Sequence, residues 1–272
     1  MAMEDDDNTL ETPILKVSEQ EQIRYLRDKA TNFIFLFGKY AIGKTAITAS
    51  LIHYLNTECH YGSLEKRGNQ EGQRLWEIIK QAIAQGRFPD RTGGENVFEV
   101  ESLFVPSNNR KHLSKLPLTF LEMSGESLSE VSIRKSGKLP SNIDLFFKAG
   151  NLSMTFIMVT SHEEAHEDDQ LMVEFLDYII QKSPRFRDSR VLLLISKWDT
   201  YAGRGNVTDF LRTQMPNTFR RLARSTNAYG SFSLGTIEEQ VDGRPFIQEY
   251  DSKPARDVFE WLYKTLTGKK IS

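Results

Sequence analysis

The sequence predicts an α/β protein in which a mostly parallel sheet, with one antiparallel strand at its edge, lies between two layers of helices. Two observations support this prediction. Short apolar segments alternate along the chain with longer segments of helical periodicity. Residues 33–37 and 191–195 are apolar at every position and residues 153–160 are mostly apolar, which favours strands that are buried on both faces.

The first elements follow in a regular order. Residues 19–29 have the pattern of a short amphipathic helix with Ser18 as its N-cap, and a second helix is predicted over 44–56, after the first strand. The polar residues 56–72 include three glycines and are expected to form a loop. Apolar side chains at helical spacing over about 71–86 predict a helix inserted ahead of the following strand.

The remaining elements continue this alternation. Strands over 97–105 and 116–123 are separated by a short turn, which favours an antiparallel hairpin. The Ser- and Gly-rich residues 124–140 are expected to form a loop. A further strand is predicted over 228–232, and helices over 144–150, 167–182, 207–223 (broken near Pro216) and 254–267.

Composition limits the classes of function. The chain has 272 residues and a formal net charge of −2, so no overall basic field attracts nucleic acid or an anionic membrane. No apolar stretch is long enough to span a bilayer, and Cys59 is the only cysteine. We expect a cytoplasmic protein with an acidic, disordered segment over residues 1–17 and a single domain over 18–272.

The most informative stretch follows the strand at 33–37. Residues 38–45 read Gly-Lys-Tyr-Ala-Ile-Gly-Lys-Thr and match G-x-x-x-x-G-K-[ST], the phosphate-binding loop. Its glycines let the backbone curl so that N–H groups form an anion-binding concavity at a helix N-terminus. The lysine would reach the β- and γ-phosphates, and the threonine hydroxyl would bind Mg²⁺. The expected nucleotide-binding residues here are Gly38, Tyr40, Ala41, Ile42, Gly43, Lys44, Thr45 and Ala46.

A second motif ends the strand at 191–195. Ser196-Lys197-Trp198-Asp199 resembles the [NT]-K-x-D motif of P-loop GTPases of the translation-factor and Ras-like (TRAFAC) class. The resemblance implies that Asp199 accepts hydrogen bonds from the guanine N1–H and N2 amine, and that the Lys197 stem covers the purine. Ser196 stands where the class usually has Asn, and its hydroxyl can still bond to the phosphate loop.

A third segment, Leu-Glu-Met-Ser-Gly at 121–125, resembles the D-x-x-G motif of the same class, with Glu122 in place of Asp. The resemblance implies that Glu122 helps to hold Mg²⁺ and that the Gly125 amide contacts the γ-phosphate. Glu126 follows where many GTPases have the Gln that orients the attacking water. It is either a base or a solvated switch residue, and these substitutions leave intrinsic hydrolysis open. Thr92 is the candidate for the first switch, where it would respond to Mg²⁺.

Two further features bear on the resemblance. Ser233 and Leu234, after the strand at 228–232, resemble the element whose backbone N–H contacts the guanine carbonyl. Tyr40 is bulky for its place in the phosphate loop, where it either crowds an arginine finger supplied by a partner or packs over the loop. Together, the P-D-R-T, L-E-M-S-G-E and S-K-W-D segments are most similar to the GTPase-like modules of bacterial conflict-associated operons, the double-GTPase domains.

The sequence therefore predicts a three-layer P-loop NTPase fold of the Ras-like type. The expected function is an Mg²⁺-dependent molecular switch that binds GTP or GDP and hydrolyses GTP, weakly or with stimulation by a partner. A guanine-nucleotide-binding pseudo-GTPase scaffold is one alternative, and a P-loop small-molecule kinase is another. A protein effector or regulator is the expected partner, and homo- or hetero-oligomers are left open. The expected catalytic residues are Thr92, Gly125 and Glu126, the expected metal ligands are Thr45, Thr92 and Glu122, and the expected base-contacting residues are Lys197, Asp199, Ser233 and Leu234.

Overall fold

The computed structural model describes residues 18–88, 97–123, 141–182, 190–203, 205–223, 227–240 and 245–271. The helices in these ranges are α1 (Glu19–Asp28), α2 (Lys44–Thr57), α3 (Gln70–Ala84), α6 (Ser141–Ala149), α7 (Ala165–Lys182), α8 (Val207–Gln214), α9 (Pro216–Leu222) and α10 (Lys253–Thr267). The strands are β1 (Asn32–Phe37), β2 (Gly62–Lys66), β3 (Val97–Pro106), β4 (Leu116–Met123), β5 (Ser153–Ser161), β6 (Arg190–Ser196), β7 (Ala228–Ser231), β8 (Gly235–Glu239) and β9 (Pro245–Tyr250). Short 3₁₀ turns cover Asn108–Arg110 (η1) and Trp198–Thr200 (η3).

In the described part of the chain, seven strands form one sheet in the order β2-β3-β4-β1-β5-β6-β7. The central strand β1 is parallel to β4 and β5, and β6 is parallel to β5 and β7. In contrast, β3 is antiparallel to both of its neighbours. This mostly parallel sheet, with a phosphate-loop motif directly after its central strand, confirms the predicted α/β fold of the Ras-like P-loop type.

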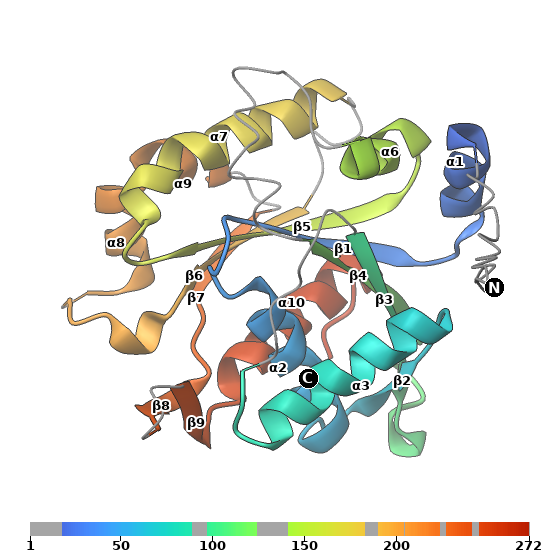
Figure 1. Cartoon of the computed structure of the whole chain (residues 1–272), viewed down its shortest axis with the longest axis horizontal. Helices are drawn as coiled ribbons and strands as arrows, with labels where there is room; N and C mark the ends of the chain where they lie inside the picture. Colours follow the sequence, from blue (N-terminus) through green and yellow to red (C-terminus); the bar gives the residue numbers. More distant parts are fainter. Residues whose placement is uncertain are drawn as a thin grey trace, which may run out of the picture.

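Helices cover both faces of the sheet, which gives three layers (Figure 1). α2, α3 and α10 lie on one face, and α6, α7, α8 and α9 lie on the other. β1 contributes side chains to the cores on both faces of the sheet, because alternate side chains of a strand point to opposite faces. Its three phenylalanines pack with α6 and α7, whereas its Ile34 and Leu36 pack with α2 and α10. The carboxyl end of β1 is therefore fixed from both sides.

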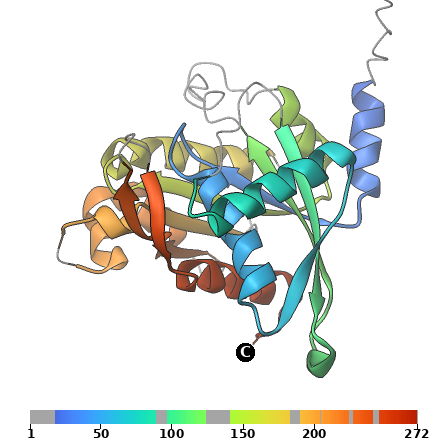
Figure 2. The same ribbon diagram turned by 60° about the horizontal axis from the view of Figure 1, so that its bottom comes forward.

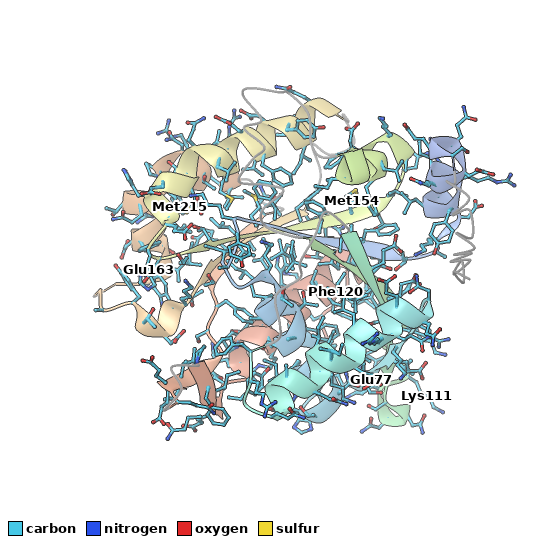
Figure 3. All side chains as sticks on the ribbon, in the orientation of Figure 1. Glu77, Lys111, Phe120, Met154, Glu163 and Met215 are labelled. Atoms are coloured by element: carbon cyan, nitrogen blue, oxygen red, sulfur yellow. The ribbon has the colours of Figure 1, made fainter. Side chains whose placement is uncertain are left out.

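The same division holds away from β1. Phe120 of β4 belongs to the core on the α2 side, and Met154 and Met215 belong to the core on the α7 side (Figure 3). Across the described ranges, none of the helices combines the length and apolar character needed to cross a membrane.

The predicted helix boundaries agree with the structure to within a few residues. Ser18 caps α1 as expected: its Oγ accepts the Glu21 N–H at 3.3 Å, while the Glu21 carboxylate accepts the Ser18 N–H at 2.9 Å. The break near Pro216 separates α8 from α9, because proline has no N–H and favours the first turn of a helix. The loop predicted over 124–140 falls outside the described residues.

The prediction for residues 56–72 is wrong in part. Residues 62–66, expected to be loop, form the edge strand β2, in which Leu64 alone is buried. A strand with one buried residue and charged neighbours has no apolar alternation to reveal it. Because β2 occupies the edge, the antiparallel strand β3 lies one position further inside the described sheet.

A second, two-stranded sheet formed by β8 and β9 was not predicted. It lies beside the C-terminal end of α3 (Figure 2), where the Ile247 N–H donates to Gly86 O at 2.7 Å. Tyr250 of β9 also bonds to α2, with 2.8 Å between its hydroxyl and that of Ser50. The hairpin is therefore fastened to the helix that follows the phosphate loop as well as to α3.

Candidate nucleotide-binding site

The phosphate loop, residues 38–43, connects the carboxyl end of β1 to α2. Ala41 and Gly43 have positive φ angles of 57° and 99°, in the region that favours glycine. Gly38 is needed for a different reason, because a Cβ at this position would clash with Val159 O of β5. The loop therefore turns tightly against the sheet. Its backbone at the N-terminus of α2 is suited to binding an anion.

Lys44 is the first residue of α2 and is buried, with only 6% of its surface exposed. Its Nζ donates to Gly38 O at 2.8 Å and to Lys39 O at 2.7 Å. These bonds hold the ammonium at the loop backbone, where it adds to the partial positive charge of the helix N-terminus. Thr45 follows in the same turn and is partly buried, at the position that the motif assigns to Mg²⁺.

Ser196, the first residue of the S-K-W-D motif, contacts the phosphate loop directly. Its Oγ lies 2.7 Å from Ile42 O and 3.1 Å from Thr160 O, and the side chain is buried. The hydrogen bond expected from this hydroxyl to the loop is therefore present, despite the short reach of serine. It fixes the carboxyl end of β6 against the phosphate loop.

The residues after Ser196 form a tight turn. Lys197 adopts a left-handed backbone conformation with φ of 53°, and the η3 turn follows it. The Lys197 ammonium lies 3.6 Å from a carboxylate oxygen of Glu163. Glu163 is labelled in Figure 3, on the same side of the molecule as the phosphate loop. Asp199 is exposed on this turn, so its carboxylate is accessible to a ligand.

The S-K-W-D turn lies beside the second segment predicted to contact the base. The Trp198 N–H donates to Phe232 O at 3.3 Å, directly before Ser233 and Leu234. Leu234 is buried, whereas Ser233 is partly exposed. The structure thus brings three of the predicted segments together at the carboxyl end of the parallel strands.

The residues predicted for catalysis are not among those described. Thr92, Gly125 and Glu126 lie outside the ranges 18–88, 97–123 and 141–182. The backbone of Glu122 lies on β4, opposite Phe98 of β3. Within the described ranges, no group of three or more His, Cys, Asp and Glu side chains is arranged to hold a metal ion. The roles given to these four residues remain predictions.

One ion pair at the loop, between a partly exposed lysine and a buried carboxylate, was not predicted from the sequence. Lys39 Nζ lies 2.7 Å from Asp168 Oδ1 and 3.7 Å from a carboxylate oxygen of Glu164. Asp168 is 0% exposed, and its second oxygen accepts the Thr160 hydroxyl at 2.6 Å. Burial disfavours the charged form of Lys39, but the hydrogen bond and charge of Asp168, with the charges of Glu164 and Glu167, outweigh it. They raise the pKa of Lys39 above its ordinary value.

The sequence does contain a signal for Asp168. This residue shares the helical stripe of Ala165, Met172 and Phe175, all of which are fully buried. A carboxylate on the core-facing side of an amphipathic helix requires a buried partner. The stripe gives no indication of which cation on the chain is that partner.

No protein-family model matches the sequence, and no curated protein matches it. One matching solved structure is Roco2 RocCORdC from Methanosarcina barkeri bound to GDP, at 14% identity and a TM-score of 0.36, covering 75% of this chain and 43% of that chain. Another is a dimerization-deficient mutant of Toc33 from Arabidopsis thaliana, at 11% identity and a TM-score of 0.44, covering 92% and 93%.

This chain therefore spans less than half the length of the Roco2 chain. Both TM-scores are below 0.5. The fold assignment rests on the strand order and on the position of the phosphate loop after the central strand.

Proposed function

We propose that this chain binds guanine nucleotides and acts as an Mg²⁺-dependent GTPase and molecular switch. The observation that carries the proposal is the hydrogen bond from Ser196 Oγ to Ile42 O. It joins the strand end that bears the S-K-W-D motif to a loop suited to phosphates. A ligand that satisfies both parts has phosphates at one end and a purine at the other.

The described residues account for binding in this proposal. Lys44 and the loop N–H groups bind the β- and γ-phosphates. The Lys197 stem lies along the purine, and Asp199 accepts from the guanine N1–H and N2 amine. Adenine has an acceptor at N1 and no amine at C2, so it would leave this carboxylate without a partner at a cost of about 1–3 kcal/mol.

Hydrolysis depends in this proposal on Thr45 and Glu122 and on three residues outside the described ranges, Thr92, Gly125 and Glu126. Thr45 would hold Mg²⁺ through its hydroxyl, with Thr92 and Glu122 as further proposed ligands. When bound, the ion neutralises charge on the phosphate oxygens. Glu126 is proposed to orient the attacking water, and the Gly125 amide to contact the γ-phosphate. Because Glu122 and Glu126 replace the Asp and Gln of the GTPase pattern, we expect slow turnover that a protein partner stimulates.

Calorimetric titration of the full chain with GTP, GDP and ATP in the presence of Mg²⁺ tests the binding proposal. We expect GTP and GDP to bind, and ATP to bind about 100-fold more weakly. Equal affinities for GTP and ATP would contradict the guanine assignment. Failure of all three to bind would contradict the proposal as a whole.

Single-turnover incubation with GTP separates the switch from its alternatives. Release of GDP and phosphate supports hydrolysis. Binding of GTP without turnover supports a pseudo-GTPase scaffold, for which the substitutions at Glu122 and Glu126 are the sequence argument. Transfer of the γ-phosphate to an added acceptor supports a small-molecule kinase.

A further inference from the structure

A residue outside every sequence motif holds the phosphate loop at two points. We propose that Asp168 of α7 is a positioning residue of the nucleotide site, and that nucleotide affinity depends on its carboxylate. The inference rests on the proposed function, because it concerns the same site. It adds a determinant of affinity that lies behind the loop.

The first anchor is Lys39, the loop residue directly after Gly38. Its ammonium pairs with Asp168 at 2.7 Å, and its side chain is 29% exposed whereas that of Asp168 is 0% exposed. Removing the Lys39 ammonium leaves the fully buried Asp168 carboxylate uncompensated in a medium of low dielectric constant. Lys39 O also accepts from Lys44 Nζ at 2.7 Å. The same anchor therefore fixes a carbonyl that holds the phosphate-binding ammonium.

The second anchor runs through the ends of two strands. The other oxygen of Asp168 accepts the Thr160 hydroxyl at 2.6 Å. The Thr160 carbonyl lies 3.1 Å from Ser196 Oγ, whose shorter bond of 2.7 Å reaches Ile42 O. Thr160, Asp168 and Ser196 are all buried, so this chain of polar contacts is shielded from water and each link is strengthened.

The two anchors lie on either side of a strained position. Ala41 has φ of 57°, which is costly for a residue with a Cβ and persists only when the surroundings hold it. Lys39 precedes Ala41 and Ile42 follows it. A loop that is fixed before binding loses less conformational entropy when phosphate arrives. Release of the Asp168 anchors should therefore weaken nucleotide binding even in a folded protein.

The neighbouring residue provides a matched control. Asp169 is another buried acid of α7, at 6% exposed. Its carboxylate accepts the backbone N–H groups of Asn217 at 3.1 Å and of Thr218 at 2.7 Å, at the start of α9. Asp169→Asn disturbs a buried carboxylate without disturbing the loop, so it should lower stability and leave nucleotide affinity unchanged.

The experiment measures the Kd of the full chain for GDP and for GTP with Mg²⁺, in the wild type, Asp168→Asn, Lys39→Met and the double variant. We expect each single substitution to raise both Kd values about tenfold. The double variant should bind about as weakly as Asp168→Asn alone, because Lys39 acts through its ion pair with Asp168. The preference for guanine over adenine should be unchanged, since Asp199 is intact.

A second pair of variants tests the inference if Asp168→Asn does not fold. Thr160→Val removes the hydroxyl that donates a hydrogen bond to Asp168, whereas Thr160→Ser keeps this hydroxyl. We expect Thr160→Val to weaken binding and Thr160→Ser to retain the wild-type Kd, which a role in packing alone would not produce.

Two results would overturn the inference while leaving the proposed function in place. One is a folded Asp168→Asn variant that binds nucleotide with the wild-type Kd. If Asp168→Asn does not fold, a wild-type Kd in Thr160→Val has the same meaning. The other is an equal loss of affinity in Asp169→Asn. A wild-type chain that binds neither nucleotide would instead overturn the proposed function, and this inference with it.

Discussion

Polar side chains gather at both ends of the parallel strands, buried at the carboxyl end and partly buried at the amino end, and the two groups differ in what they hold. At the carboxyl end, Lys44 and Ser196 donate to backbone carbonyls of the phosphate loop. At the amino end, Lys29, just before β1, pairs with the carboxylates of Glu99 and Glu101 of β3. One group fixes the shape of a loop, and the other fixes strands against each other.

The amino end also contains a cavity of about 300 Å³, which lies beside the start of β1. Its polar lining is already engaged: Asn32 Nδ2 donates to Pro117 O at 2.9 Å, and Ser153 Oγ donates to Asn32 Oδ1 at 2.7 Å. Side chains that satisfy one another gain little from a ligand. In this protein, the side chains that hold the phosphate loop in a strained conformation therefore indicate the nucleotide site better than the volume of a cavity does.

Lys29→Met tests the amino end and has the largest expected effect. Burial disfavours charged Lys29, but its hydrogen bonds to Glu101 and Glu99 outweigh burial and hold its pKa well above the ordinary value. Its loss leaves two carboxylates without their cation. We expect the free energy of unfolding, measured with urea, to fall by about 3 kcal/mol, with nucleotide affinity unchanged.

The pH dependence of this effect follows from the raised pKa. Because folding raises the pKa of Lys29, its charge contributes stability in full at any pH below the pKa of the unfolded chain, and this contribution is lost only as pH rises through the pKa of the folded protein. The difference in unfolding free energy between the wild type and Lys29→Met should therefore be constant between about pH 6 and 9. Lys66→Met, in the exposed pair with Glu77, is the control and should cost less than about 1 kcal/mol. A loss of GTP affinity in Lys29→Met would break the distinction between the two ends.

Lys44→Ala tests the carboxyl end. We expect GTP affinity to fall about 100-fold, because a charge-assisted hydrogen bond to phosphate is lost, while the urea midpoint changes little. Calorimetry with GTP and Mg²⁺ measures this loss. Lys253→Ala is a matched control, since Lys253 is also the first residue of a helix but is exposed and pairs with Asp257. Equal affinities in the two variants would remove the phosphate-loop role of Lys44.

Ser196→Ala tests the link between the two motifs. Without the hydroxyl, Ile42 O loses its buried donor, so we expect affinity for GTP and GDP to fall about tenfold. Ser196→Thr keeps the hydroxyl and should bind nearly as the wild type does. A titration in which Ser196→Ala matches the wild type would show that the loop does not depend on β6.

His53→Phe has the smallest expected effect and concerns neither end of the sheet. His53 of α2 packs edge-on against Tyr250, with ring centroids 4.9 Å apart. Burial lowers the pKa of His53, and the charge of Lys80 adds to this while that of Glu58 opposes it. As pH falls below the ordinary value, the unfolded chain takes up the proton first, so wild-type stability declines.

Phenylalanine keeps the ring and removes this titration. Between pH 7 and 5, we expect His53→Phe to lose less unfolding free energy than the wild type, by under about 1 kcal/mol in urea titrations. An equal loss in both proteins would show that another group causes the decline.

The sequence was sufficient to predict the phosphate loop and the polar end of β6, because their residues are consecutive and follow fully apolar strands. The bond from Ser196 to the loop could be expected once both motifs were identified. In contrast, the pairing of Lys39 with Asp168 joins a loop to a helix distant along the chain. The helical stripe marks Asp168 as unusual, but only the folded packing of α7 identifies its partner.

The missed strands have a similar physical explanation. β2 buries Leu64 alone, and β8 is mostly exposed, so neither shows the apolar alternation that distinguishes a strand from a loop. Both are held by backbone pairing with a neighbour, as β2 is with β3. Such pairing depends on where the neighbour lies and leaves little trace in the side chains.

The central claim is that the turn after Ser196 recognises the base of a nucleotide held by the phosphate loop. Its most direct test is the affinity of Asp199→Asn for GTP and for xanthosine triphosphate, whose C2 carbonyl replaces the guanine amine and can accept from an amide. We predict that the variant loses about tenfold in GTP affinity and binds the xanthine nucleotide better than the wild type does. A folded variant with the wild-type preference for GTP would contradict the claim.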